Sequence, residues 1–265
     1  MSLSSPAGEL RVDEPAPQVA RLTISNPGKR GALDQPILDA LAHTLPRLDA
    51  RCVIITGEGR TFSAGYDIGD LRDGGFADEA EKLVAHPFAA AIDAVEAYPY
   101  PTIAALNGHA IGGGLELALS CDLRLAAHPI RLGMPPAKLG LVYSHTGIRK
   151  FIDTIGAART RELFLVAGRI NAATAHVWGL VNAVHGADEL AGAAVALAAE
   201  IAANAPLAQR GNKRVIRAVL DAEAELDPEV ERELLALRHA CFHSEDFREG
   251  VRAFAEKRPP RWQGR

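Results

Sequence analysis

The segment NGHAIGGGLELALSCDLRLAA, residues 107–127, decides the fold class of this chain. Three glycines separate a strand-like stretch from the apolar helical stretch LELALSCD, and the strand-like LRLAA follows at once. This order of strand, helix and strand is typical of βα units and not of a β-sandwich. The same segment raises a chemical question, because the apolar helix carries the carboxylate of Glu116 in its first turn.

Strand-like and helix-like stretches also alternate on both sides of residues 107–127. Periodicity and glycine punctuation predict strands at 19–26, 51–59, 102–114, 123–127 and 180–186, and helices at 35–50 and 78–97. The glycine-rich stretch 61–75 fits neither period and is interpreted as a functional or mobile loop. From Asp188 the pattern is almost entirely helical, over 188–205, 206–224 and 227–258. We therefore expect a core at residues 1–187, of which 1–18 is a frayed lead-in, and a helical region at 188–265.

Composition narrows the function classes. The chain has 265 residues, 48% of them hydrophobic and 23% charged, with a net charge of −4, so it resembles a globular protein and offers no excess of positive charge for nucleic acid. The N-terminal stretch lacks the basic and apolar regions of a secretory signal. The most membrane-like stretch, 190–208, contains Glu200 and Asn204 and meets Pro206, so we expect a helix packed by small side chains and no membrane partner.

The cysteines and histidines give no sign of a metal site. Cys52, Cys121 and Cys241 lie far apart and match no ligand spacing, which favours free thiols in a reducing cytoplasm. The nine histidines show no paired spacing. We therefore expect no metal and a cytoplasmic location.

The glycines do not fit the common phosphate and nucleophile motifs. No Lys-Ser or Lys-Thr follows Gly114, so a Walker cradle is excluded, and the glycine spacing does not match a dinucleotide fingerprint. Neither Ser63 nor Ser144 lies in G-x-S-x-G, so a nucleophile elbow is not predicted.

The glycines favour an oxyanion hole instead. A helix N-terminus exposes unpaired N–H groups, and glycine lets a ligand approach them. A second donor is available in FSAGYD, where Gly65 permits a sharp turn that aims the N–H of Tyr66 outward. Two N–H groups facing one carbonyl oxygen stabilise an enolate or a tetrahedral oxyanion.

Glu116 has two interpretations at this stage. Three residues after Gly113 it falls near N3, where a glutamate commonly closes a capping box. A side chain in that first turn also stands beside any anion that the turn binds, so a catalytic role is equally compatible with the spacing. Ser144 is interpreted as the N-cap of the following helix, and Asp122 as structural.

Five motifs resemble, in order and spacing, the enoyl-CoA hydratase/isomerase (crotonase) superfamily: NPGKRGAL, TFSAGYDI, residues 107–127, AKLGL and SEDFREGVRAFAEKRPP. The resemblance covers nearly the whole chain from about residue 19. It implies an α/β fold with a ClpP-like spiral of ββα repeats, and a C-terminal helical region that forms a homotrimer or a dimer of trimers. It also implies acyl-CoA thioester substrates, and an oxyanion hole made by the N–H groups of Tyr66 and Gly113.

The resemblance also implies where coenzyme A binds. Coenzyme A is then part of the substrate, and no separate cofactor is expected. Its contacts would be Lys29, Arg30, Ala32, Ala64, Asp67 and Ile68, with Phe254 and Lys257 supplied by a neighbouring subunit. From the residues alone, the two lysines and Arg30 can also be explained as solvated surface charges.

The chain departs from a hydratase of this superfamily at Pro136. There the family's hydratases carry a second glutamate, twenty residues after the one at Glu116, and proline can neither accept nor donate a proton. The pattern more closely resembles methylmalonyl-CoA decarboxylase-like members, which carry a proline at this point and a tyrosine, here Tyr143, that addresses the substrate carboxylate. The chain differs from them at Tyr66, where they have a histidine.

The favoured function is therefore an acyl-CoA lyase that stabilises a thioester enolate and decarboxylates a malonyl-type acyl group. Tyr143, His145 or a water molecule would protonate the enolate. An enoyl-CoA hydratase or isomerase that uses Glu116 with a substitute for the second glutamate is the alternative, and His145 is a candidate acid there. A non-catalytic homologue that binds coenzyme A or RNA is the alternative from another class, although the chain shows no basic stripe interleaved with aromatic residues.

Overall fold

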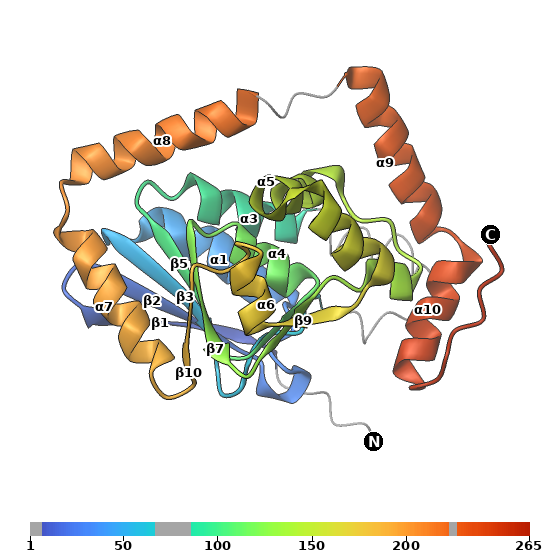
Figure 1. Ribbon diagram of the computed structural model, residues 1–265, viewed down its shortest axis with the longest axis horizontal. Helices are drawn as coiled ribbons and strands as arrows, with labels where there is room; N and C mark the ends of the chain where they lie inside the picture. Colours follow the sequence, from blue (N-terminus) through green and yellow to red (C-terminus); the bar gives the residue numbers. More distant parts are fainter. Residues whose placement is uncertain (1–6, 67–85, 223–226) are drawn as a thin grey trace.

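Two β-sheets form the frame of the molecule (Figure 1). From β3 to β8, successive strands of the chain join the two sheets alternately. The computed structural model describes residues 7–66, 86–222 and 227–265. The larger sheet has the order β1-β2-β3-β5-β7-β10, and the smaller sheet has the order β4-β6-β8-β9. The strands are β1 (Glu9–Ala16), β2 (Val19–Ser25), β3 (Cys52–Gly57), β4 (Thr61–Ser63), β5 (Thr102–Leu106), β6 (His109–Ile111), β7 (Leu123–His128), β8 (Arg131–Gly133), β9 (Arg169–Asn171) and β10 (Ala183–Gly186).

Helices follow the strands in a repeating order. The α-helices are α1 (Gln35–Thr44), α3 (Pro87–Ala97), α4 (Gly113–Leu119), α5 (His145–Arg161), α6 (Ala172–Val177), α7 (Leu190–Ala203), α8 (Pro206–Ala222), α9 (Pro228–Phe242) and α10 (Glu245–Ala255). The short 3-10 or π helices are η1 (Pro27–Lys29), η2 (Leu45–Arg47), η3 (Pro136–Leu139) and η4 (Glu162–Val166). Three successive units each supply one strand to the larger sheet, one to the smaller sheet and then a helix: β3-β4-α3, β5-β6-α4 and β7-β8-α5. The predicted spiral of ββα repeats is thereby confirmed.

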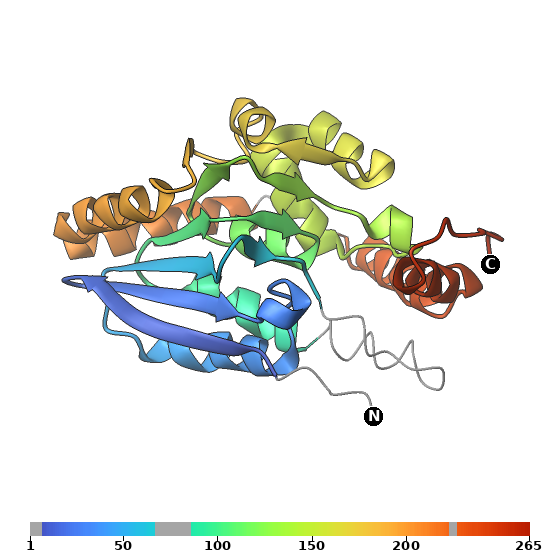
Figure 2. The same ribbon diagram turned by 90° about the horizontal axis from the view of Figure 1, so that it is seen from below.

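The larger sheet is parallel except at one edge, where β1 runs antiparallel to β2. In Figure 2 its strands step from the blue N-terminal pair towards the green β7. The central strands are buried on both faces and rich in β-branched residues, as CVIITG in β3 illustrates. This arrangement brings the C-terminal ends of β4 and β6, and the glycine-rich bends that follow them, to one edge of the smaller sheet.

The structure corrects four predictions about the elements. Residues 9–16 are not frayed, because they pair with β2, and Arg21 holds Asp13 across the two strands. The predicted strand 102–114 is two strands, since the Asn107 side chain bonds to the backbone of Gly57 and Gly59 and interrupts the ladder. The helix predicted at 35–50 ends at Thr44, before the Pro46 turn. The helical run 227–258 breaks where Ser244 caps α10 by accepting a hydrogen bond from the Phe247 N–H at 3.0 Å.

Helix α7 lies on the larger sheet and packs through small side chains, as predicted for this stretch, with Ala194 and Ala198 fully buried. Among the described residues no single helix has the length and apolar composition to cross a membrane; α7 and α8 pass that test only as a pair bent by 105°. The three cysteines are free thiols, as expected.

Helices α8 and α9 run around the outside of the body, and α10 lies at the opposite end from α7 (Figure 1). None of the α8 residues is buried, yet Lys213 ties the helix to the core. Its ammonium donates to Asp122 Oδ2 at 2.7 Å and to the Tyr100 carbonyl at 3.0 Å. Asp122 also accepts hydrogen bonds from the N–H and the hydroxyl of Thr102, which confirms its structural role.

Candidate active site

Two glycine bends meet at the N-terminus of α4. Gly65 has φ +92° and Gly112 has φ +56°, conformations that side chains rarely tolerate. The bends are in contact, since a methyl group on Gly65 would stand 2.7 Å from the Ile111 carbonyl oxygen and 3.3 Å from the Gly113 nitrogen. The prediction of a sharp turn at Gly65 is confirmed, and the turn lies directly against the first residue of α4.

The two predicted donors have no acceptor within the described part of the chain. The Gly112 N–H donates to the Gly133 carbonyl at 2.9 Å, while the N–H groups of Tyr66 and Gly113 bond to none of these residues. Leu33 pairs with the 65–66 bend by donating to the Gly65 carbonyl at 2.8 Å, which leaves the Tyr66 N–H out of the ladder. Both amides therefore retain the hydrogen-bonding capacity that an oxyanion hole requires.

The side chain of Tyr66 closes one side of this corner. Its ring packs edge-on against Phe88 of α3, with centroids 4.8 Å apart. It also lies over Gly113, where an added Cβ would stand 3.0 Å from the ring. Glycine at position 113 thus leaves room for the Tyr66 ring, which would have to shift by a few tenths of an ångström to accept a larger residue there.

The carboxylate of Glu116 is buried and does not cap its helix. Gly112 is the N-cap residue, and its N–H donates to the Gly133 carbonyl and not to Glu116, so the capping-box interpretation is wrong. The side chain points instead to Tyr143, whose hydroxyl donates a short hydrogen bond to Glu116 Oε2. The physical reason is position, since Glu116 is the fourth helical residue and lies beyond the reach of the N-cap amide.

Helix α5 fixes the position of Tyr143. Ser144 caps the helix, as predicted, by accepting from the Gly147 N–H at 3.1 Å. Gly147 permits close packing, because a Cβ there would stand 2.7 Å from the Tyr143 ring and 2.9 Å from Glu116 Oε1. Tyr143 is further held by an edge contact with Phe164. The start of α5 is therefore built around the Tyr143–Glu116 pair.

Burial governs the protonation of this pair. Desolvation raises the pKa of Glu116 above its ordinary value, and the hydrogen bond from Tyr143 counteracts part of that rise. Burial, and then the charge of Glu116, raise the pKa of Tyr143 well above its ordinary value. Tyr66 has its pKa raised for the same two reasons, and its hydroxyl interacts with that of Tyr143. Both tyrosines are therefore protonated donors at neutral pH, beside one acid that can exchange a proton.

Two basic residues that sequence reasoning missed act on this acid. Lys150 of α5 and Arg238 of α9 both lower the pKa of Glu116 by their charge, and Glu96 of α3 raises it. Lys150 forms an ion pair with Glu96. Helical spacing could have placed Lys150 near the start of α5, but nothing in the local pattern indicates that α9 returns to this site.

His145 lies at the first position of α5, next to the cap. Its Nε2 is 3.5 Å from Glu231 Oε1 of α9, and the side chain is mostly covered. The structure thus brings His145 into the neighbourhood of Tyr143 but pairs it with α9. Its catalytic role stays a prediction.

The segment predicted to bind coenzyme A lies beside the first bend. Lys29 ends η1, and Arg30 follows in a left-handed conformation with its carbonyl accepting from the Ala64 N–H at 3.1 Å. Ala32 is buried, and its carbonyl accepts from the Asn26 side chain at 2.9 Å. Ala64 is exposed. These residues are therefore assembled at one place, while Asp67 and Ile68 lie outside the described residues.

Pro136, Phe254 and Lys257 are the remaining residues that the sequence assigns to the site. Pro136 is buried and opens η3, so no carboxylate occupies that position. Phe254 is 62% exposed on α10, and Lys257 follows that helix in a left-handed conformation. The assignment of Phe254 and Lys257 to a neighbouring subunit stays a prediction.

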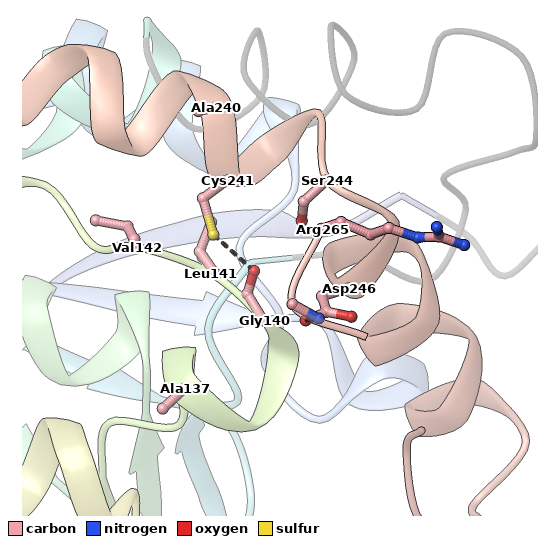
Figure 3. Close-up of a pocket in the computed structure, with 10 residues that line it drawn as sticks. Ala137, Gly140, Leu141, Val142, Ala240, Cys241, Ser244, Asp246 and Arg265 are labelled. Atoms are coloured by element: carbon pink, nitrogen blue, oxygen red, sulfur yellow. Dashed lines mark hydrogen bonds between the residues drawn. The ribbon is translucent and has the colours of Figure 1, made fainter. Parts of the chain in front are cut away.

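A pocket of about 430 Å³ opens between η3, α9 and the C-terminal tail (Figure 3). Its lining includes Gly140, Leu141 and Val142 on one side and Cys241 on the other, where the thiol donates to the Gly140 carbonyl at 2.9 Å. Neither hole donor lines it, nor does Glu116 or Tyr143. The pocket is a neighbour of the candidate site and not the site itself.

The comparisons with known proteins identify the family and the fold. The enoyl-CoA hydratase/isomerase family model matches residues 14–265. A Bacillus subtilis (strain 168) protein named "probable enoyl-CoA hydratase" is 36% identical over 253 residues, covering 93% of this chain and 95% of that one. The 2,3-dehydroadipyl-CoA hydratase of Escherichia coli (strain K12) is 32% identical over 256 residues, covering 94% and 96%. A methylmalonyl-CoA decarboxylase complexed with 2S-carboxypropyl-CoA superposes with a TM-score of 0.88 at 29% identity, covering all of both chains.

The chain belongs to the enoyl-CoA hydratase/isomerase family, whose members include the hydratases and whose fold it shares with the decarboxylase. The resemblance predicted from the motifs is confirmed, as is the crotonase fold. The choice between the chemistries of these relatives lies in the residues around the hole.

Proposed function

We propose that this protein is a crotonase-family lyase that decarboxylates a malonyl-type acyl-CoA. The observation that carries the proposal is that the amides of Tyr66 and Gly113 bond to none of the described residues, while the buried acid Glu116 accepts a hydrogen bond from a protonated Tyr143. Pro136 occupies the position of the second acid that water addition uses in the family's hydratases. The solved decarboxylase of the same fold supports the assignment.

The reaction requires an electron sink more than a strong base. As the bond between the α-carbon and the carboxylate breaks, its electron pair moves into the thioester and CO2 leaves. The N–H groups of Tyr66 and Gly113 stabilise the charge on the thioester oxygen; one such donor changes kcat by about 100- to 1,000-fold. A proton from the Tyr143–Glu116 pair then reaches the α-carbon and gives the saturated acyl-CoA. Coenzyme A enters as part of the substrate, and the scheme uses no other cofactor.

The experiment offers purified protein methylmalonyl-CoA and crotonyl-CoA in separate assays. Release of CO2 from the first, with slow or no loss of enoyl absorbance from the second, is the expected result. Rapid hydration of crotonyl-CoA without CO2 release would contradict the proposal.

Hydration or double-bond isomerisation is the second candidate, because the sequence relatives above carry hydratase names and Glu116 is retained. In that case Glu116 would hold the water or move the proton, and Tyr143 or His145 would substitute for the missing glutamate. The same pair of assays separates the two candidates.

We also propose that the working form is a homotrimer or a dimer of trimers. Helix α8 has no buried residue, and its exposed apolar side chains include Leu207 at 81% and Ile216 at 61%. Such a helix normally packs against another surface. Light scattering coupled to size exclusion should give three or six times the chain mass of 28.2 kDa, and Ile216→Glu should reduce it. A wild-type monomer would refute this assembly.

A further inference from the structure

One face of α9 lies against the segment that leads to Tyr143. Glu231 at the start of this face contacts His145, and Cys241 at its end contacts the Gly140 carbonyl. Figure 3 shows the second contact, with the end of α9 beside Gly140 and Val142. Residues 231, 234, 238 and 241 are spaced by three and four positions and therefore share a face. Arg238 thus lies on the side of α9 that faces residues 140–145.

Arg238 is held in place without a carboxylate. Its guanidinium stacks 5.4 Å above the centroid of the Phe242 ring, and Phe242 is itself buried. Within the described ranges 7–66, 86–222 and 227–265, no acidic side chain forms an ion pair with Arg238. A half-buried guanidinium that is oriented by an aromatic ring keeps its donors for another anion.

The contacts of α9 place Arg238 beside the segment 140–145 that leads to Tyr143. The charge of Arg238 lowers the pKa of both Tyr66 and Glu116, which supports this placement. Lys150, another cation that acts on Glu116, already pairs with Glu96. The hydroxyl of Tyr143 donates to Glu116. Among the described residues that act on Glu116, Arg238 is therefore the group best suited to meet a second negative charge on the substrate.

We propose that Arg238 is a specificity-determining residue that binds the free carboxylate of a dicarboxylic acyl-CoA. The inference rests on the proposed function, because it places the acyl group between the hole and α9. It revises the expected role of Tyr143, which supports Glu116, while the guanidinium of Arg238 receives the carboxylate. Guanidinium suits this task because its planar fork matches two carboxylate oxygens.

The test measures binding of two unreactive thioethers, 2-carboxypropyl-CoA and propyl-CoA, by isothermal titration calorimetry. The wild type should bind the carboxylated compound more tightly. Arg238→Gln should weaken the affinity for 2-carboxypropyl-CoA about tenfold or more, as expected for loss of a charge-assisted hydrogen bond. The affinity of this variant for propyl-CoA should stay within about twofold of the wild-type value. The affinity of Arg238→Lys for 2-carboxypropyl-CoA should lie between those of the wild type and Arg238→Gln. Arg232→Gln is the matched control, since Arg232 is an exposed arginine of the same helix that bonds to the Pro228 carbonyl.

Equal weakening of both thioethers by Arg238→Gln would overturn the proposal, because it would assign the arginine to the phosphates shared by both compounds. Unchanged affinities would also overturn it. Thermal melting of each variant verifies that the fold is retained, and Arg238→Lys provides a second folded variant. Since neither thioether is turned over, this outcome is independent of whether the wild type releases CO2, so failure of the proposed reaction is distinguishable from failure of this inference.

Discussion

The turn at Gly65 lies against the backbone nitrogen of Gly113, close enough that a methyl group on Gly65 would stand 3.3 Å from it. The two segments are separated by nearly fifty residues, and the neighbouring strands β4 and β6 bring them together. This contact sets the geometry of the proposed oxyanion hole, which can be tested at the Gly113 donor.

Gly113→Pro removes the N–H of Gly113 at the first helical position, where proline is well tolerated. The expected result is a loss of kcat of about 100-fold or more for every acyl-CoA reaction. Gly113→Ala is the control, since it introduces a Cβ against the Tyr66 ring but keeps the N–H. If the alanine variant loses as much turnover as the proline variant, the steric contact and not the missing donor explains the loss.

Tyr143→Phe removes the hydrogen bond that lowers the pKa of Glu116. The pKa of that carboxyl should therefore rise further. Because the proposed step needs a proton from this pair, and Glu116 alone can supply it in the variant, the alkaline limb of the pH–rate profile should move to higher pH. We expect turnover to fall about 100-fold, which is typical of a lost acid–base partner. Steady-state rates from pH 5 to 9 provide the measurement, and an alkaline limb that stays in place would rule out coupling between the two groups.

Glu116→Gln should make the protein more stable at neutral pH. Burial raises the folded-state pKa of Glu116 above its ordinary value of 4.5, so the unfolded chain releases this proton first. The free energy of unfolding of the wild type then falls as pH rises from 4.5 through the folded-state pKa, by about 1.4 kcal/mol for each unit of difference. Glutamine lacks this dependence and can still accept from Tyr143. Urea unfolding should show a higher free energy of unfolding for the variant than for the wild type at pH 8, and a smaller difference at pH 4. An equal difference at both pH values would argue against a raised pKa of Glu116.

Asp122→Ala should destabilise the core by about 1–3 kcal/mol, because it leaves the Thr102 N–H and hydroxyl and the Lys213 ammonium without their shared acceptor. Lys213→Met removes only one of these partners and should cost less. Urea denaturation at neutral pH gives both values. A larger loss of unfolding free energy for Lys213→Met than for Asp122→Ala would mean that the attachment of α8 contributes more to stability than the Thr102 contacts do.

The sequence predicts what depends on local rules. Gly65, Ser144 and the buried strand 52–57 act through backbone conformation, capping and burial, and each lies where its pattern indicates. Asp122 was likewise predicted to be structural, since it follows the helix.

The predictions that fail concern residues whose structure depends on contacts with residues distant in the chain. Residues 9–16 are too polar to indicate a strand until β2 supplies the pairing. The N-terminal spacing of Glu116 suggests a cap, but Tyr143, twenty-seven positions later, takes its carboxylate. Arg238 could not be connected with Glu116 from the sequence, because only the return of α9 to residues 140–145 brings its charge to act on that carboxyl.

The donor proposed at position 66 belongs to the main chain, so exchange of the side chain would alter its packing against Phe88 and Gly113 but would keep the N–H. Under the proposed function, exchange of the Tyr66 ring or of the basic residue on α9 would change which thioesters bind, while the amides that receive negative charge keep their place. Substrate preference and the charge-accepting step could then evolve separately.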